Sequence, residues 1–207
     1  MVFALAACGE AASDPTDAPE SEAPASEAPA SEAPASEAPE GDGTFTTIVE
    51  GKLTMSTNAQ FPPYEMTTDD GGFEGIDVEI ATAIAEKLGL ELQIDDMDFD
   101  AALLSVQQGK ADIAMAGITV TDERMAVMSF SDSYATGIQV VIVKEGGKVK
   151  SLDDMAADGV IIGTQSGTTG FKYASGDFGD EKVKGFTKTT DAVAALINGQ
   201  VDCVMLD

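Results

Sequence analysis

The stretch DAALLSVQQGKADIAMA (residues 100–116) predicts a helix from Asp100 to Gln108, closed by Gly109, and then a buried strand from Asp112 to Ala116. A weak copy, DAVAALINGQVDCVML, occupies residues 191–206 and again has an Asp-opened helix, a Gly stop and an apolar strand. Two lobes built alike would explain the repeat. Chance would explain it equally well, because helix–Gly–strand units are common.

The rest of the body, residues 45–207, alternates between strands and helices. Further helices are expected from the stripe of Ile76, Ile80, Ile84 and Leu88 with Gly89 as its stop, after Ser151, from about Thr168, and over 191–198. Strands are expected over 52–57, 90–94, 160–163, 182–186 and 202–206, and the β-branched run 137–144 would be the crossing between lobes. This alternation predicts α/β layers. Ligands of open α/β sheets lie beyond the carboxyl ends of the strands, which directs attention to residues 116–124, 164–170 and Asp207.

The composition excludes several classes of partner and chemistry. The 207 residues hold 37 Asp and Glu against 11 Lys and Arg, a formal net charge of −26 at pH 7. Such an excess of acid repels nucleic-acid phosphates and anionic membrane surfaces. The chain has no His, the side chain most used for acid–base catalysis and zinc binding, so an enzyme is disfavoured. Residues 96–107 lack the Gly and Glu of a calcium loop and 163–170 match neither glycine-rich nucleotide motif, so no metal or cofactor is expected.

The charge falls into two populations that divide near Thr44. Residues 1–44 hold ten acidic side chains and no Lys or Arg, and the pentad SEAPA begins there at Ser21, Ser26, Ser31 and Ser36. Residues 9–44 cannot bury enough apolar surface to offset the entropy of ordering, so they are predicted to form a disordered linker. The body keeps 27 acidic and 11 basic side chains, a net charge of −16.

The first eight residues, MVFALAAC, resemble the end of a bacterial lipoprotein signal peptide, with Leu5 to Cys8 as the lipobox. This resemblance implies that Cys8 carries a lipid and anchors the protein outside the cytoplasm. A full signal peptide has a basic region and about 7 to 15 apolar residues, so the start is expected to be truncated. A buried apolar start with a chance Cys is the alternative. Cys203 lies in an apolar strand and is expected to be a buried structural thiol.

Arg124 is the only arginine, and it follows a predicted strand end in ITVTDER (118–124). Thr121 is expected to cap a helix, which places Arg124 in the first turn, where a cation opposes the helix dipole. A guanidinium in this position indicates a carboxylate partner held bidentately. That partner could be a ligand or an Asp or Glu of the chain.

Six short motifs, in order, are similar to those of the bacterial extracellular solute-binding proteins of family 3, which serve polar amino-acid ABC importers. They are NAQFPPYE (58–65), GFEGID (72–77), MDFD (97–100), GKAD (109–112), AGITVTDER (116–124) and GTQSGTT (163–169). The resemblance covers about residues 52–207. It implies an α/β, two-lobed type II periplasmic-binding-protein fold that is truncated at its C-terminus, with lobe 1 over 45–138 and lobe 2 over 139–207.

The resemblance also implies a binding site for a free amino acid. Arg124 would bind the α-carboxylate, helped by Thr119 and the backbone N–H of Thr169, and Asp207 would bind the α-ammonium. Phe61 and Phe99 would sandwich the side chain, and Asn58 and Gln165 would contact its polar end. The implied ligand-binding set is Asn58, Phe61, Phe99, Ala116, Gly117, Thr119, Arg124, Gln165, Thr169 and Asp207.

Together with the lipobox, the family resemblance implies a lipid-anchored substrate-binding component that delivers an amino acid to the permease of an ABC importer. It is expected to be a monomer. Asn58 and Gln165 are neutral where several relatives have Asp or Lys, which favours an uncharged polar amino acid. The alternative functions on the same fold are a ligand-sensing module and a dehydratase-like enzyme. A catalytic carboxylate facing the ligand would favour the enzyme.

Overall fold

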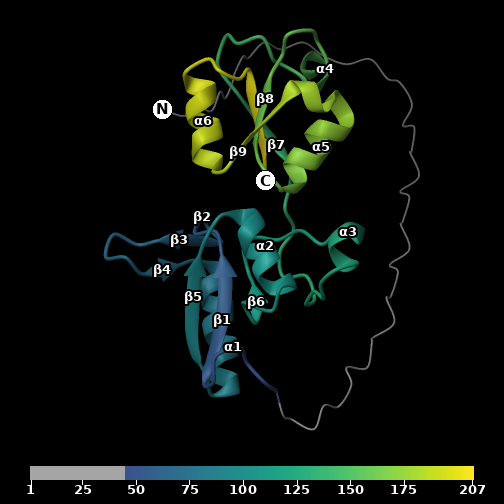
Figure 1. Ribbon diagram of the computed structural model, residues 1–207. Coiled ribbons are helices and arrows are strands. Elements are labelled where there is room, and N and C mark those ends of the chain that lie inside the picture. Colours follow the sequence, from purple (N-terminus) through teal and green to yellow (C-terminus); the bar gives the residue numbers. More distant parts are fainter. Residues whose placement is uncertain (1–44) are drawn as a thin grey trace, which may run out of the picture. The chain divides into compact units, whose positions relative to one another are not determined.

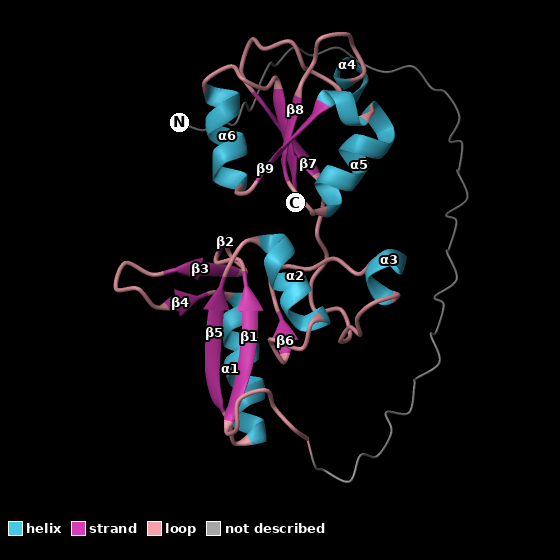
Figure 2. Ribbon diagram, viewed as in Figure 1, coloured by secondary structure: helices cyan, strands magenta, loops and turns pink. Residues whose placement is uncertain are grey.

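The computed structural model describes residues 45–207, so the expectations for residues 1–8, for the linker 9–44 and for Cys8 lie outside the described residues. The described part contains two α/β halves, each with its own sheet of mostly parallel strands (Figure 1 and Figure 2). Each helix within 45–207 is too short or too polar to cross a membrane.

The first half is built around a central strand that is covered on both faces. Its elements are β1 (Lys52–Thr57), β2 (Gln60–Phe61), β3 (Glu65–Thr67), β4 (Phe73–Glu74), α1 (Ile76–Leu88), β5 (Glu91–Asp96), α2 (Phe99–Gln107), β6 (Ile113–Ala114) and α3 (Asp122–Met125). The main sheet has the order β5-β1-β6, and both pairs are parallel. Met55 of β1 packs against Ala81 of α1, and the next residue, Ser56, donates a 2.9 Å hydrogen bond to the carbonyl of Ala102 in α2. Five of the six β1 residues are therefore buried, as in other strands with helices on both sides.

Helix α1 has the predicted bounds and ends at Gly89 in the left-handed conformation, but the face it buries differs from the predicted stripe. Ile76, Ile84 and Leu88 are 41%, 38% and 41% exposed. The buried face consists of smaller residues, Val78, Ala81 and Ala85. Small side chains allow α1 to approach the strand closely, so the large apolar residues were a poor guide to its inner face.

Two further expectations for the first half need correction. Strand β6 covers only Ile113–Ala114 and is shorter than predicted. The Asp112 carboxylate, just before it, accepts hydrogen bonds from the backbone N–H groups of Thr54, at 2.8 Å, and Ile48, at 2.9 Å. The antiparallel sheet β2-β3-β4 was not predicted at all. Its strands have only two or three residues, which is too short for a period-two pattern to appear.

The second half repeats the layering of the first. Its elements are β7 (Val140–Val143), α4 (Leu152–Met155), β8 (Ile162–Gln165), α5 (Thr169–Phe178), a 3₁₀ turn (Asp180–Lys182), β9 (Val183–Phe186), α6 (Thr189–Ile197) and β10 (Cys203–Leu206). The sheet order is β7-β10-β8-β9, with only β7 antiparallel. Figure 2 shows α5 and α6 on opposite faces of this sheet, and the core is accordingly divided into two clusters.

Three sequence expectations bear on this half. The repeated units occupy corresponding places, since β6 pairs in parallel with β1 and β10 pairs in parallel with β8. The run 137–144 forms a strand only over β7, and most of it is exposed because β7 lies at the edge of the sheet. Cys203 is fully buried, which confirms its predicted burial, and this burial raises the pKa of its thiol to about 11.

Candidate functional site

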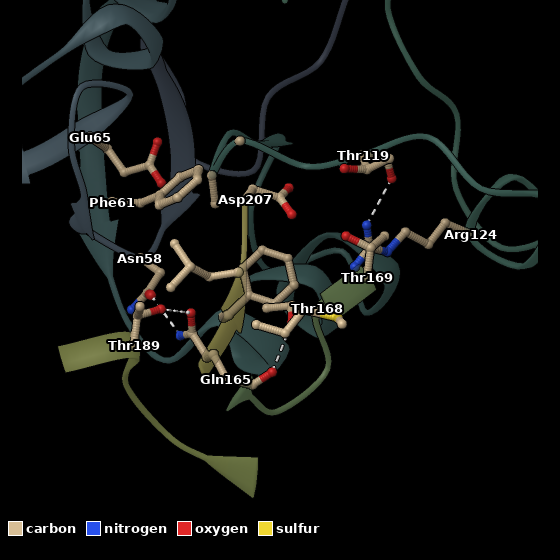
Figure 3. Close-up of a pocket in the computed structure, with 15 residues that line it drawn as sticks. Asn58, Phe61, Glu65, Thr119, Arg124, Gln165, Thr168, Thr169, Thr189 and Asp207 are labelled. Atoms are coloured by element: carbon tan, nitrogen blue, oxygen red, sulfur yellow. Dashed lines mark hydrogen bonds between the residues drawn. The ribbon is translucent and has the colours of Figure 1, made fainter. Parts of the chain in front are cut away.

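A cavity lies beyond the carboxyl ends of β1, β6, β8 and β10, and both halves line it (Figure 3). The centre of a water-sized sphere can occupy about 40 Å³ of it, and the space that no atom fills, open mouth included, is about 490 Å³. The first half contributes Asn58, Phe61, Glu65, Phe99, Ala116, Gly117, Thr119 and Arg124, and the second contributes Gln165, Thr168, Thr169, Thr189, Met205, Leu206 and Asp207. The expectation that ligands of open α/β sheets lie beyond the carboxyl ends of the strands therefore located the cavity correctly.

Arg124 is held in this cavity by its own backbone and by two carbonyl groups. Thr121 caps α3, as predicted, and its hydroxyl accepts a 3.3 Å hydrogen bond from the Arg124 N–H. The guanidinium donates to the carbonyl of Thr119 at 2.7 Å and to that of Gly167 at 3.1 Å. It also lies 5.4 Å from the centre of the Phe99 ring, a cation–π distance. The charged head is therefore fixed in orientation.

The charge of Arg124 lacks a carboxylate partner within residues 45–207. No Asp or Glu oxygen of this part of the chain lies within 4.0 Å of its nitrogens, and the residue is only 5% exposed. Burial lowers the pKa of Arg124, while Glu123, Asp100 and Asp207 oppose this effect from a distance. An ion pair with a described residue, one of the two alternatives drawn from the sequence, is thus excluded. The carbonyl groups of Thr119 and Gly167 accept from only two of the five N–H donors of the guanidinium.

The beginning of α5 adds backbone donors to the same wall. Thr168 caps this helix, and its hydroxyl accepts the N–H of Phe171 at 3.2 Å. The Thr169 hydroxyl accepts a 3.1 Å hydrogen bond from the Gln139 amide, which fixes the first turn. Thr168 and Thr169 both line the cavity. The positive end of the helix dipole and a guanidinium together make this wall suited to an anion such as a carboxylate.

Asp207 supplies an acidic group to the same cavity. It directly follows β10 and is half-buried. Burial raises the pKa of its carboxyl, and the positive charge of Arg124 partly opposes the rise. A half-buried acid and a buried base that line the same cavity form a pair of opposite charges that a zwitterion could bridge.

Three polar side chains form a hydrogen-bonded group at another part of the wall. The Gln165 amide N–H donates to the Asn58 side-chain oxygen at 3.0 Å, and the Thr189 hydroxyl donates to the Gln165 oxygen at 2.9 Å. Asn58 in turn donates to the carbonyl of Met97 at 2.8 Å. This Asn58–Gln165–Thr189 group joins the two halves directly.

Residues 53–207 match the bacterial extracellular solute-binding proteins, family 3. The chain belongs to this family. It is 34% identical over 155 residues to a probable histidine-binding protein of Neisseria gonorrhoeae, a match that covers 74% of the chain and 58% of that relative. The chain therefore spans little more than half the length of this curated relative.

Solved structures of amino-acid-binding proteins have the same fold. Holo ArgBP from T. maritima superposes with a TM-score of 0.71 and 39% identity, over 76% of this chain and 69% of that one. An ancestral amino-acid-binding protein, described as a precursor of cyclohexadienyl dehydratase, superposes with a TM-score of 0.70 and 31% identity. The match covers 76% of this chain and 70% of that one. The two halves of the family 3 chain are thus the lobes of a type II periplasmic-binding-protein fold, as the motifs predicted.

The aromatic wall of this family 3 cavity depends on a glycine. The Phe61 ring stacks on Tyr64, with ring centres 5.3 Å apart and planes at 15°. A Cβ atom at Gly117 would lie 2.6 Å from the Phe61 ring, and Gly117 has a φ of 55°. Only glycine fits both the space and the left-handed backbone here.

All ten residues of the predicted ligand-binding set line the cavity. The sequence did not identify five others, Glu65, Thr168, Thr189, Met205 and Leu206. Thr168 and Glu65 lie inside family motifs quoted above, so these motifs could have identified both as lining residues. Thr189 lies in no such motif, and no local sequence pattern predicts its position in the cavity. Within residues 45–207, no group of three or more Cys, Asp or Glu side chains could hold a metal ion.

Proposed function

We propose that the protein is the extracytoplasmic substrate-binding component of an amino-acid ABC importer, which captures a free L-amino acid between its lobes and delivers it to the permease. One observation carries the proposal. Arg124, buried without a carboxylate partner among the described residues, faces the same cavity as Asp207. The curated relative and the two structures cited above are all named for amino-acid binding.

The charges explain why an amino acid is the ligand that fits. A zwitterion enclosed by protein loses water at both its charges, and each must then meet an opposite charge. Arg124 and the first turn of α5 would take the α-carboxylate, and Asp207 would take the α-ammonium with the Thr119 hydroxyl and the Gly117 carbonyl. Neither charge of the site would remain unpaired in the complex.

The remaining parts of the proposal concern the rest of the chain. Lobe 1 would extend over 45–138 and lobe 2 over 139–207. Residues 1–8 would be the end of a signal peptide, Cys8 the lipid-bearing residue, and 9–44 a disordered tether to the membrane. The acting form would be a monomer, which needs no metal or cofactor.

A thermal-shift screen of the protein against the common amino acids tests the central claim. Ligand at about 100 times its dissociation constant stabilises a protein by about 2.7 kcal/mol, so a true ligand gives a clear shift in melting temperature. We expect shifts with uncharged polar amino acids and with their L forms only. If every amino acid leaves the melting temperature unchanged, the proposed function is wrong.

Amino-acid affinity should fall on acidification, and it should do so at a higher pH than an ordinary Asp would cause. Asp207 must be ionised to bind the α-ammonium, and burial raises its pKa above the usual value. As the pH drops through this raised pKa, affinity should decrease by up to about tenfold per pH unit. Calorimetry from pH 7.5 down to pH 4 measures this dependence.

Two variants make the pH experiment specific. Asp207→Asn should bind weakly at every pH, without the acid-dependent decrease. Asp191→Asn, at an exposed acid in α6, should behave as the wild type. An affinity that stays constant from pH 7.5 to pH 4 would contradict the role of Asp207.

A dehydratase-like activity is the second candidate, and one observation favours it. Glu65, a fully buried acid, is among the residues that line the cavity, and one relative is described as the precursor of a cyclohexadienyl dehydratase. We propose binding without catalysis, since the relatives cited above are binding proteins. Incubation with a cyclohexadienyl acid, followed by the ultraviolet absorbance of an aromatic product, distinguishes the two. Turnover abolished by Glu65→Gln would replace the binding proposal.

A further inference from the structure

Glu65 is the one fully buried acid in the wall of the cavity. It begins β3 opposite Phe61 of β2, and its side chain is 0% exposed. Neither carboxyl oxygen accepts a hydrogen bond from a donor group within residues 45–207. Figure 3 shows Glu65 beside Phe61 and well apart from Arg124. Glu65 therefore lies where the side chain of a bound amino acid would end, if its α-carboxylate is at Arg124.

The second carboxyl of this region, Asp77 in α1, is already committed. Asp77 is also 0% exposed, and it accepts the backbone N–H of Gly117 at 2.9 Å and the Tyr134 hydroxyl at 2.8 Å. Each oxygen of Asp77 therefore already has a donor among the described residues. Two buried carboxylates side by side repel each other, and neither can donate a hydrogen bond, so one proton between them removes both problems.

The proton belongs on Glu65 for electrostatic reasons. Burial, then repulsion by Asp77, and then a hydrogen bond to Asp77 raise the pKa of Glu65 to about 10. The other titratable groups nearby are Tyr64 and Tyr134, and the hydroxyl of Tyr134 keeps its proton because burial and Asp77 raise its pKa. The remaining acids of the packed elements, Glu74 in β4 and Glu79 and Glu86 in α1, are exposed.

We propose that Glu65 is a specificity-determining residue that enters binding as a protonated carboxylic acid, hydrogen-bonded to Asp77. The proposal rests on the amino-acid function proposed above. A ligand with an uncharged, hydrogen-bonding side chain meets a neutral acid and binds without any change in protonation. A cationic side chain binds only when the proton of Glu65 leaves to the solvent and the resulting carboxylate pairs with the cation.

Arginine and citrulline are the matched probes, because they have nearly the same shape and differ in charge. Each arginine bound should release one proton, so the ratio of arginine to citrulline affinity should rise about tenfold per pH unit between pH 6 and pH 8. The ratio cancels the contribution of Asp207, which acts on both ligands equally. Calorimetry in buffers of different ionisation enthalpy counts the protons directly, with one expected for arginine and none for citrulline.

Glu65→Gln replaces the acid by its neutral isostere. Citrulline affinity should then change by less than about threefold, and the pH dependence of the affinity ratio should disappear. Glu74→Gln is the matched control at the exposed acid of the neighbouring strand and should keep the wild-type ratio. A wild-type ratio that is independent of pH, or proton uptake with citrulline, would overturn the proposal.

A measurement without ligand separates this proposal from the function on which it rests. Carbon-13 NMR of glutamate carboxyl groups should show one protonated glutamate at pH 8, and its signal should be absent in Glu65→Gln. An ionised Glu65 at pH 8 would overturn the proposal even if amino acids bind. If no amino acid binds, the proposed function fails, and the NMR titration still decides the state of Glu65.

Discussion

Replacing Arg124 by alanine should weaken amino-acid binding by about 2 to 5 kcal/mol, at least about 30-fold. The substitution removes the donors that would hold the α-carboxylate and leaves that carboxylate buried without an opposite charge. The lost affinity should be independent of the amino-acid side chain, because every amino acid has the same α-carboxylate. Isothermal titration calorimetry with two different ligands measures both the size and the uniformity of the loss.

Stability provides the control for this experiment. Arg124 is a buried cation without an ion-pair partner in residues 45–207. Its removal relieves an uncompensated buried charge and loses two hydrogen bonds to backbone carbonyls, and because the two effects oppose each other the melting temperature of the protein alone should change little. Arg124→Lys keeps the charge and loses the planar fork, and should give an intermediate affinity. Lys172→Ala removes an exposed ion pair with Glu123 and should leave both stability and affinity nearly unchanged. Amino-acid binding that survives Arg124→Ala almost unchanged would contradict the carboxylate role.

Gly75→Ala should destabilise the protein by about 3 kcal/mol or more. Gly75 precedes α1 with φ 127° and ψ 174°, a region open essentially to glycine alone, and the backbone strain costs roughly 1–3 kcal/mol. Its Cβ would also lie 2.2 Å from the carbonyl oxygen of Tyr64, and overpacking of this kind adds roughly 1–3 kcal/mol. That carbonyl cannot move freely, because it accepts the N–H of Asp77 at 2.9 Å. Urea denaturation followed by circular dichroism measures the loss.

The other end of the same helix offers a matched substitution. Gly89 has a φ of 69°, and nothing lies within 4 Å of its Cβ position. Gly89→Ala should therefore lower the free energy of unfolding only by the cost of holding alanine in the left-handed conformation, about 1–2 kcal/mol. Equal losses for Gly75→Ala and Gly89→Ala would show that the contact with Tyr64 is unimportant.

The sequence predicted best where one physical signal was strong over several residues. The bounds of α1 were right because an apolar stripe begins it and a glycine in the left-handed conformation ends it. The capping of α3 by Thr121 was right because the hydrogen bond is local. The inner face of α1 could not be predicted, since it depends on how closely the helix approaches the sheet.

The cavity was predicted from motifs, and its chemistry only in part. The motifs and the carboxyl ends of the predicted strands together gave ten of its lining residues, but not how those residues are bonded. That Asn58 and Gln165 bind each other, 107 positions apart, is a property of the folded chain. The buried state of Glu65 also escaped prediction, because it depends on Asp77 in a different element.

The Asn58–Gln165–Thr189 group has a consequence for how strongly the site binds. The protein's own hydrogen bonds hold part of the wall together, so the free energy of closing the site does not come from the ligand alone. The apparent affinity of such a site is the intrinsic affinity multiplied by the fraction of molecules in the competent conformation. Substitutions at Asn58 or Thr189 can therefore tune the working concentration range of the protein while every group that binds the zwitterion stays the same.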